Sequence, residues 1–133
     1  MQSKTPIAPD RIAFVIAGAL GATGVALGAF GAHALKAWLP TVENGAQRLA
    51  WWQTATDYHL WHALLAALFA SQVHRFPRLT TGVLLCVVGT LLFSGSLYVM
   101  TLTDLRILGA VTPLGGVAFI VAWLWLAIGT RRV

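Results

Sequence analysis

The chain has 133 residues, of which 58% are hydrophobic and only 10% charged, and its formal net charge is +5. A soluble domain carries about 25% charged residues, so this composition excludes most soluble enzymes and binding modules. Its 9 lysines and arginines stand singly or in pairs and form no basic patch, which argues against nucleic acid as a partner.

Four long apolar runs divide the chain, at residues 12–32, 54–73, 80–102 and 107–129. Each has about 20 residues or more, the length of α-helix that crosses the ~30 Å hydrocarbon core of a membrane. Asp57 is the one formally charged side chain inside these runs. We therefore predict an all-α fold, a four-helix transmembrane bundle that forms a single domain over residues 1–133.

The first run is rich in glycine. On a helix with about 100° per residue, four of these glycines fall within about 80° of one another: Gly21, Gly24, Gly28 and Gly31. Such a smooth stripe lets another helix approach closely, so we predict glycine-rich helix packing along this face. The sequence leaves open whether the second helix belongs to the same chain or to another copy.

The second run belongs to a longer predicted helix. Proline ends the helix that precedes Leu39-Pro40, and from Val42 to Val73 no proline follows. The first turns of this helix are expected outside the membrane or along its surface. Tyr58 and His62 are four residues apart and share a face, whereas Asp57 points about 140° away from His62.

The third run contains a polar stripe at spacings of four, four and three, made of Thr90, Ser94, Tyr98 and Thr101. Lipid is a costly environment for hydroxyl groups, so this stripe should face the bundle interior. A tight turn is expected at Asp104-Leu105-Arg106. In the fourth run, Pro113 with the glycines after it predicts a kink near one end of the helix.

Polar side chains of all four runs are expected at one depth in the outer half of the bundle: His33, Tyr58, His62, Ser94, Tyr98 and Thr112. We favour an interhelical hydrogen-bond network that fixes the packing and requires no cofactor. One alternative is a pocket for a quinone or lipid headgroup, with Tyr58 and His62 as donors. Another is a metal or haem site that uses His33, His59 and His62.

The cations predict the orientation. The two termini and the turn after the second run carry six of them, and the opposite side carries three: Lys4, Arg11, Arg75, Arg78, Arg131 and Arg132 against Lys36, Arg48 and Arg106. The positive-inside rule therefore predicts that both termini are cytoplasmic. Trp38, Trp51 and Trp52 on one side, and Trp123 and Trp125 on the other, are expected to anchor the bundle at the two membrane interfaces.

Four segments together resemble one known family. They are the stretch from Gly28 to Lys36, Tyr58-His-Leu-Trp-His62-Ala, Phe93-Ser-Gly-Ser-Leu-Tyr98, and Thr112-Pro-Leu-Gly-Gly116 followed by Trp123. They are similar to the YgdD family of small four-span bacterial membrane proteins, a domain of unknown function with a related eukaryotic transmembrane branch. The resemblance implies the fold, the membrane and the motif positions His33, Tyr58, His62, Ser94, Tyr98, Thr112, Pro113, Gly115 and Gly116. At position 59 the family often has a different polar residue, and the resemblance implies no reaction, substrate or cofactor.

We therefore expect a non-enzymatic protein of the bacterial inner membrane, an accessory or structural subunit with membrane lipids, further copies or a larger complex as its partners. A quinone-, lipid- or metal-binding protein is the alternative. A small transporter is less favoured, because the first run lacks a carboxylate and Asp57 is a weak substitute. No nucleophile–base pair or carboxylate dyad shares a face, which argues against an enzyme.

The orientation can be tested with single cysteines at Thr5, Glu43 and Thr130 in a Cys86→Ala background. If both termini are cytoplasmic, an impermeant thiol reagent labels Glu43→Cys in intact cells and leaves Thr5→Cys and Thr130→Cys unlabelled until the membrane is permeabilised. The reverse pattern would invert the assignment.

Overall fold

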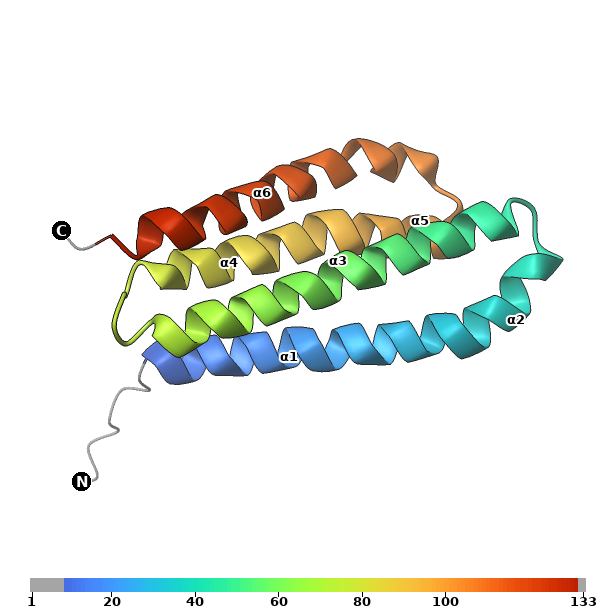
Figure 1. Ribbon diagram of the computed structural model, residues 1–133. Coiled ribbons are helices and arrows are strands. Elements are labelled where there is room, and N and C mark those ends of the chain that lie inside the picture. Colours follow the sequence, from blue (N-terminus) through green and yellow to red (C-terminus); the bar gives the residue numbers. More distant parts are fainter. Residues whose placement is uncertain (1–8, 132–133) are drawn as a thin grey trace, which may run out of the picture.

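The computed structural model describes residues 9–131, and these form helices, turns and no strand. Its helices are α1 (Pro9–Phe30), α2 (Lys36–Trp38), α3 (Gly45–Gln72), α4 (Leu79–Gly89), α5 (Gly95–Thr103) and α6 (Thr112–Gly129). A π turn at Gly31–Leu35 joins α1 to α2, and another at Thr90–Ser94 joins α4 to α5. The chain therefore forms four long helical rods that run side by side in alternating directions (Figure 1). The predicted all-α fold is confirmed.

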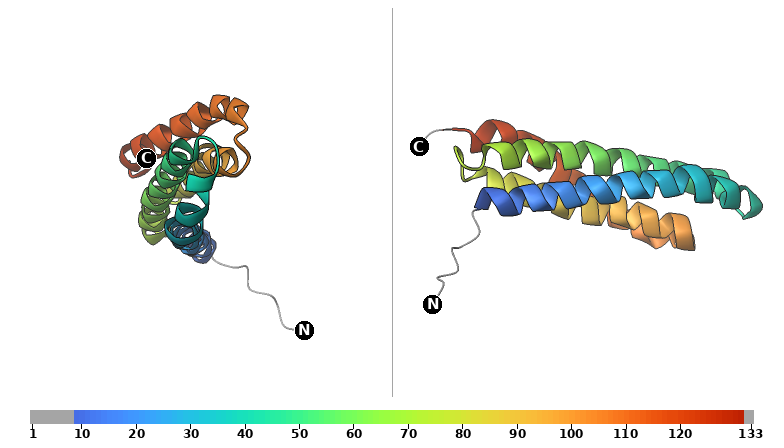
Figure 2. Two further views of the ribbon diagram at one scale, coloured as in Figure 1. Left: turned by 90° about the vertical axis from the view of Figure 1, so that its right-hand side faces the viewer. Right: turned by 90° about the horizontal axis from the view of Figure 1, so that it is seen from below.

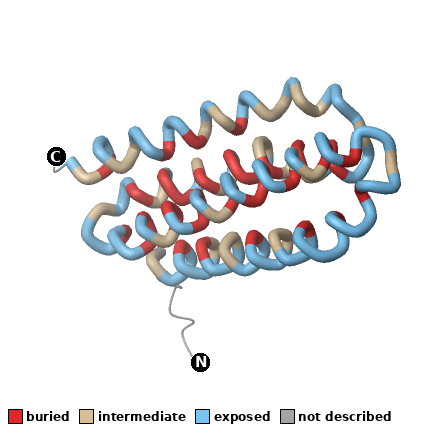
Figure 3. The backbone as a smooth tube through the Cα atoms, turned by 45° about the vertical axis from the view of Figure 1, so that its right-hand side comes forward, coloured by how far each residue is buried: buried red, intermediate tan, exposed pale blue. Residues whose placement is uncertain are grey.

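The rods follow their order in the sequence. α1 packs on α3, α3 packs on α4 and α5, and α6 packs on α4. α1 and α6 lie at opposite edges of the bundle, as the end-on view shows (Figure 2). The start of α1 and the end of α6 lie at the same end of the bundle, the end with the turn between α3 and α4 (Figure 1). Buried positions face the neighbouring rods, and the outward faces of the two edge rods are exposed (Figure 3).

Three segments are long and apolar enough to cross a membrane, namely Asp10–Thr41, Leu79–Thr103 and Arg106–Gly129. α3 is long, with 28 residues, but it is less apolar than these three. The reason lies in its position. Thr56, His59 and His62 on α3 are buried against the other rods, so this helix can be polar without exposing those groups to lipid.

The expected helix boundaries differ from the structure at two places. The first rod runs past residue 32, because the π turn keeps it helical. It ends in a short 3₁₀ turn, Leu39–Thr41, which contains Pro40. The predicted kink at Pro113 is wrong. Arg106–Ala110 is a separate 3₁₀ turn and α6 begins at Thr112, so Pro113 occupies the first helical turn, where a missing N–H costs no hydrogen bond.

The largest of three apolar core clusters occupies the half of the bundle near the chain ends. Phe69 on α3 is fully buried, and its ring covers Gly82 of α4, where a Cβ atom would lie 2.7 Å from it. Ala17 and Ala122 close this core from the two edge rods. Small residues thus let three helices approach one large aromatic ring.

Glycines of α1 and of the π turn after it face α3 in the other half. A Cβ at Gly24 would lie 2.8 Å from Leu60, and one at Gly31 would overlap the Trp52 indole. Trp52 is 3% exposed and its Nε1–H donates to the Leu27 carbonyl at 2.8 Å. The expectation that Trp52 anchors the membrane interface is therefore wrong, since it is a core residue between α1 and α3.

Gly31 and Gly21 form a matched pair for measuring this contact. Gly31→Ala should lower the free energy of unfolding in detergent by about 2 kcal/mol, because the Trp52 indole must move and give up its hydrogen bond to the Leu27 carbonyl. Gly21→Ala should be neutral or stabilising, since nothing lies within 4 Å of its Cβ position and alanine favours the helix. If both variants lose the same stability, Gly31 does not lie closer to α3 than Gly21 does.

Candidate functional site

His62 connects α3 to α6 in the middle of the bundle. Its Nδ1 lies 2.7 Å from the Tyr58 carbonyl, which can only accept, so the ring proton is on Nδ1. Nε2 is then free to accept the indole N–H of Trp123 at 3.2 Å. The imidazole also stacks on Phe119, with ring centroids 3.4 Å apart. This bond to Trp123 joins the second and fourth helical rods, as a bond of the favoured interhelical network would.

His59 forms a second connection, between α1 and α5. The Thr23 hydroxyl donates to the Ala19 carbonyl at 2.8 Å, so its oxygen accepts from His59 Nε2–H at 3.4 Å. His59 Nδ1 then accepts the Tyr98 hydroxyl at 3.2 Å. His59 is 4% exposed and joins three helices in the described chain, whereas sequence reasoning gave it a minor role.

Ser94 and Thr112 make separate local contacts. Ser94 is fully buried in the π turn and donates to the Ala55 carbonyl at 2.7 Å, which fastens α3 to the third rod. Thr112 lies 2.7 Å from Ser96, hydroxyl to hydroxyl, at the start of α6. A Cβ on Gly115 would overlap the backbone of Phe93, so this glycine allows α6 to approach the π turn.

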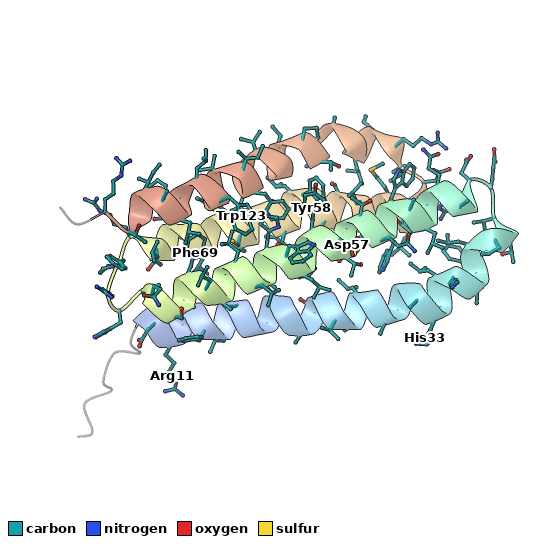
Figure 4. The ribbon with its side chains drawn as sticks, viewed as in Figure 1. Arg11, His33, Asp57, Tyr58, Phe69 and Trp123 are labelled. Atoms are coloured by element: carbon teal, nitrogen blue, oxygen red, sulfur yellow. The ribbon has the colours of Figure 1, made fainter. Side chains whose placement is uncertain are left out.

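The other two candidates are more exposed. His33 is exposed on the first rod, far from Tyr58 (Figure 4). Tyr58 is 44% exposed, and its ring packs on Phe93 and Phe119 at 4.5 and 6.1 Å between centroids. Residues 9–131 contain no group of three or more His, Cys, Asp or Glu side chains placed to hold a metal ion. The structure thus groups Tyr58 with His62 and separates His33 from them.

Arg48 is an important side chain that sequence reasoning missed. It is 7% exposed, and its guanidinium donates to the Thr101 and Leu102 carbonyls at 2.7 and 3.0 Å. These carbonyls end α5, where a cation is favoured by the helix dipole. The Thr101 hydroxyl lies 3.0 Å from the Arg48 carbonyl and can donate to it. Arg48 is on the same helix face as Trp52, Ala55 and His59, which follow it at spacings of four, three and four. This pattern could have predicted that Arg48 is buried.

Arg48→Met should therefore destabilise the bundle by about 3 kcal/mol, because two hydrogen bonds from a charged donor are lost. Arg106→Met is the control, since Arg106 is exposed and its ion pair with Asp104 should contribute no more than about 1 kcal/mol. Thermal unfolding in detergent compares the two. If Arg48→Met destabilises the protein less than Arg106→Met does, the hydrogen bonds from Arg48 to the end of α5 do not stabilise the bundle as proposed.

Comparison with known proteins identifies the family. The family described as "Protein of unknown function (DUF423)" matches residues 27–116. The UPF0382 membrane protein YwdK of Bacillus subtilis is 43% identical over 123 residues, which cover 90% of this chain and 96% of YwdK. The UPF0382 inner membrane protein YgdD of Escherichia coli K12 is 38% identical over 126 residues, covering 93% and 92%. No solved structure matches.

These matches confirm the resemblance in the four motif segments and extend it over most of the chain. The relatives are named as membrane proteins, and three segments of this chain are long and apolar enough to cross a membrane. This chain is therefore a membrane protein and a member of the DUF423 family of unknown function.

Proposed function

We propose that this chain is a non-enzymatic inner membrane protein that crosses the bilayer four times with both termini in the cytoplasm, and that it acts as a structural or accessory subunit. The inner-membrane location is supported by the name of the E. coli relative. The cytoplasmic termini are supported by the excess of cations at that end.

The fourth crossing would be α3. Its 28 residues give a length of about 42 Å, which exceeds the hydrocarbon core. Its two buried histidines have partners inside the bundle, Trp123 for His62 and Tyr98 for His59. A helix whose polar groups are paired in this way can cross lipid in spite of its composition.

The observation that carries the structural role is the internal pairing of the polar cluster. In the described part of the chain, Thr90 Oγ1 is the one buried side-chain N or O atom without a hydrogen-bond partner. A catalytic base or nucleophile must have a free atom that meets the substrate. His59 and His62, by contrast, use both ring nitrogens in hydrogen bonds within the protein. Such a network fixes how the helices pack.

The role as a subunit is supported by the edge rods. The outward faces of α1 and α6 carry large exposed apolar side chains, such as Ile12 and Val15 on α1 and Ile120 and Leu124 on α6. In a four-rod bundle these faces meet either lipid or the helices of another protein. Native mass measurement of the protein extracted in mild detergent should give a particle larger than one 14.2 kDa chain plus its micelle.

A specific observation favours the alternative of a quinone or lipid headgroup at this site. Tyr58 is 44% exposed beside His62, so its phenol could donate to a ligand that approaches from the lipid. A metal or haem at His33 and His62 has no comparable support, because His33 is exposed on the first rod whereas His62 is buried, and residues 9–131 hold no group of three or more His, Cys, Asp or Glu side chains placed for a metal ion.

A double-mutant cycle with His62→Leu and Trp123→Phe tests the network. Each single variant should lose about 1 to 2 kcal/mol of stability, since one partner of the hydrogen bond is left unpaired. The double variant should lose less than the sum, with a coupling energy of about 1 kcal/mol. Additive losses would mean that this bond does not fix the packing.

His62→Gln separates the structural proposal from the ligand alternative. Glutamine keeps a hydrogen-bonding group but loses the imidazole ligand and much of the stacking on Phe119. We expect a folded protein, about 1 kcal/mol less stable, with unchanged co-purified lipid, quinone and metal content. Loss of a bound quinone, pigment or metal from a folded His62→Gln protein would favour the alternative.

A further inference from the structure

A groove runs between α1 and α3 on the side of α3 away from the His62 contacts. Toward the α2 end it is a polar cavity of about 420 Å³, whose lining includes Lys36, Gln53, Thr56 and Asp57. Toward the chain ends it is an apolar cavity of about 490 Å³, lined by Phe14, Gly18, Gly21, Val25, Leu60 and Leu64 among others. Cavities of this size hold small ligands or the chain of an amphiphile.

Asp57 stands where the two cavities meet. It lines the polar cavity, and with Leu60, Trp61 and Leu64 it also lines a smaller hollow of about 200 Å³ that shares Leu60 and Leu64 with the apolar cavity. Its carboxylate is exposed near the middle of α3 (Figure 4), and within residues 9–131 no cation lies within ion-pairing distance of it. Ionisable side chains in the apolar segments of membrane proteins are costly, and they commonly mark the sites of ions, substrates or ligands.

The apolar part of the groove is empty because of two glycines. Nothing lies within 4 Å of a Cβ built on Gly18 or on Gly21, whereas Gly24, Gly28 and Gly31 on the same helix contact α3. The glycine stripe thus packs α1 against α3 at one end and leaves a channel at the other. This channel lies against exposed side chains of both helices, including Val25 and Leu64, so a chain can enter it from the lipid.

We propose that this groove binds a single-chain amphiphile with an alkylammonium headgroup. The ammonium pairs with the Asp57 carboxylate, and the alkyl chain lies in the channel over Gly18 and Gly21. Trp61 lines the same hollow as Asp57 and offers an aromatic ring to the cation. An anionic or neutral headgroup at this junction would leave the carboxylate unpaired.

The order of the groups along the groove selects this class of ligand. Asp57 adjoins the apolar channel directly, so the positive charge must be next to the chain. In a phospholipid the phosphate lies between the chains and any ammonium group, so a negative charge would come nearest to Asp57. Lys36 lines the polar cavity beyond Asp57, where it can meet an anion carried further out on the same headgroup. This site shares no residue with the hydrogen bonds of His62.

The test is binding of radiolabelled tetradecyltrimethylammonium to the purified full-length protein in dodecyl maltoside, with every variant in identical micelles. We expect saturable binding of one probe per chain. Asp57→Asn should weaken it by about tenfold or more, because the charge is lost with little change of shape. Gly18→Leu should weaken it similarly by filling the channel. Glu43→Gln, at an exposed acid outside the groove, should bind like the wild type.

Competitors separate the parts of the ligand. Tetramethylammonium, which has no chain, and tetradecyl maltoside, which has no charge, should each displace the probe only at much higher concentration. Elution volume and thermal unfolding check that each variant is folded. Absence of saturable binding to the wild type would overturn the proposal, as would Asp57→Asn binding within about twofold of wild type. Unchanged binding to folded Gly18→Leu would refute the channel as the site of the chain.

Discussion

The fold depends on one constraint, namely that the hydrocarbon core of a membrane offers no hydrogen-bond partners. A polar group that is buried between the helices at that depth must find its partner within the protein. Ser94 meets this requirement through the Ala55 carbonyl, and His59 through the Tyr98 hydroxyl. These bonds join neighbouring rods, so the requirement that polar groups be paired also determines which helices pack together and in which register.

The same constraint explains why the least apolar helix lies inside. α3 packs between the first and third rods. His59 bonds to Tyr98 of the third rod, and His62 reaches Trp123 of α6. α1 and α6, whose polar residues are few, lie at the edges. Two π turns adjust the helices locally, one at Gly31–Leu35 where Gly31 meets Trp52, the other at Thr90–Ser94 where Ser94 bonds to Ala55. A central polar helix with apolar helices at the edges is a stable order in lipid.

The structure separates two kinds of polar side chain. His59 and His62 use their ring nitrogens in hydrogen bonds within the protein, and these bonds stabilise the packing of the helices. Asp57 is different, because it lies on the surface of α3 beside an unfilled channel and has no ion-pair partner in the described chain. Chemistry toward a ligand therefore belongs more naturally to the α1–α3 groove than to the polar cluster at His62.

The sequence by itself determined the all-helical fold and the membrane, since long apolar runs and scarce charge depend only on composition and spacing. It also determined that Tyr58 and His62 share a face, because helix periodicity fixes this locally. Only the tertiary structure decided that His59 and Arg48 are interior groups, that Trp52 is a core residue, and that Pro113 begins a helix rather than bending one. Periodicity gives the direction of a side chain around its own helix. Its partner depends on which neighbouring helix covers that direction, and this follows from close packing of the whole bundle.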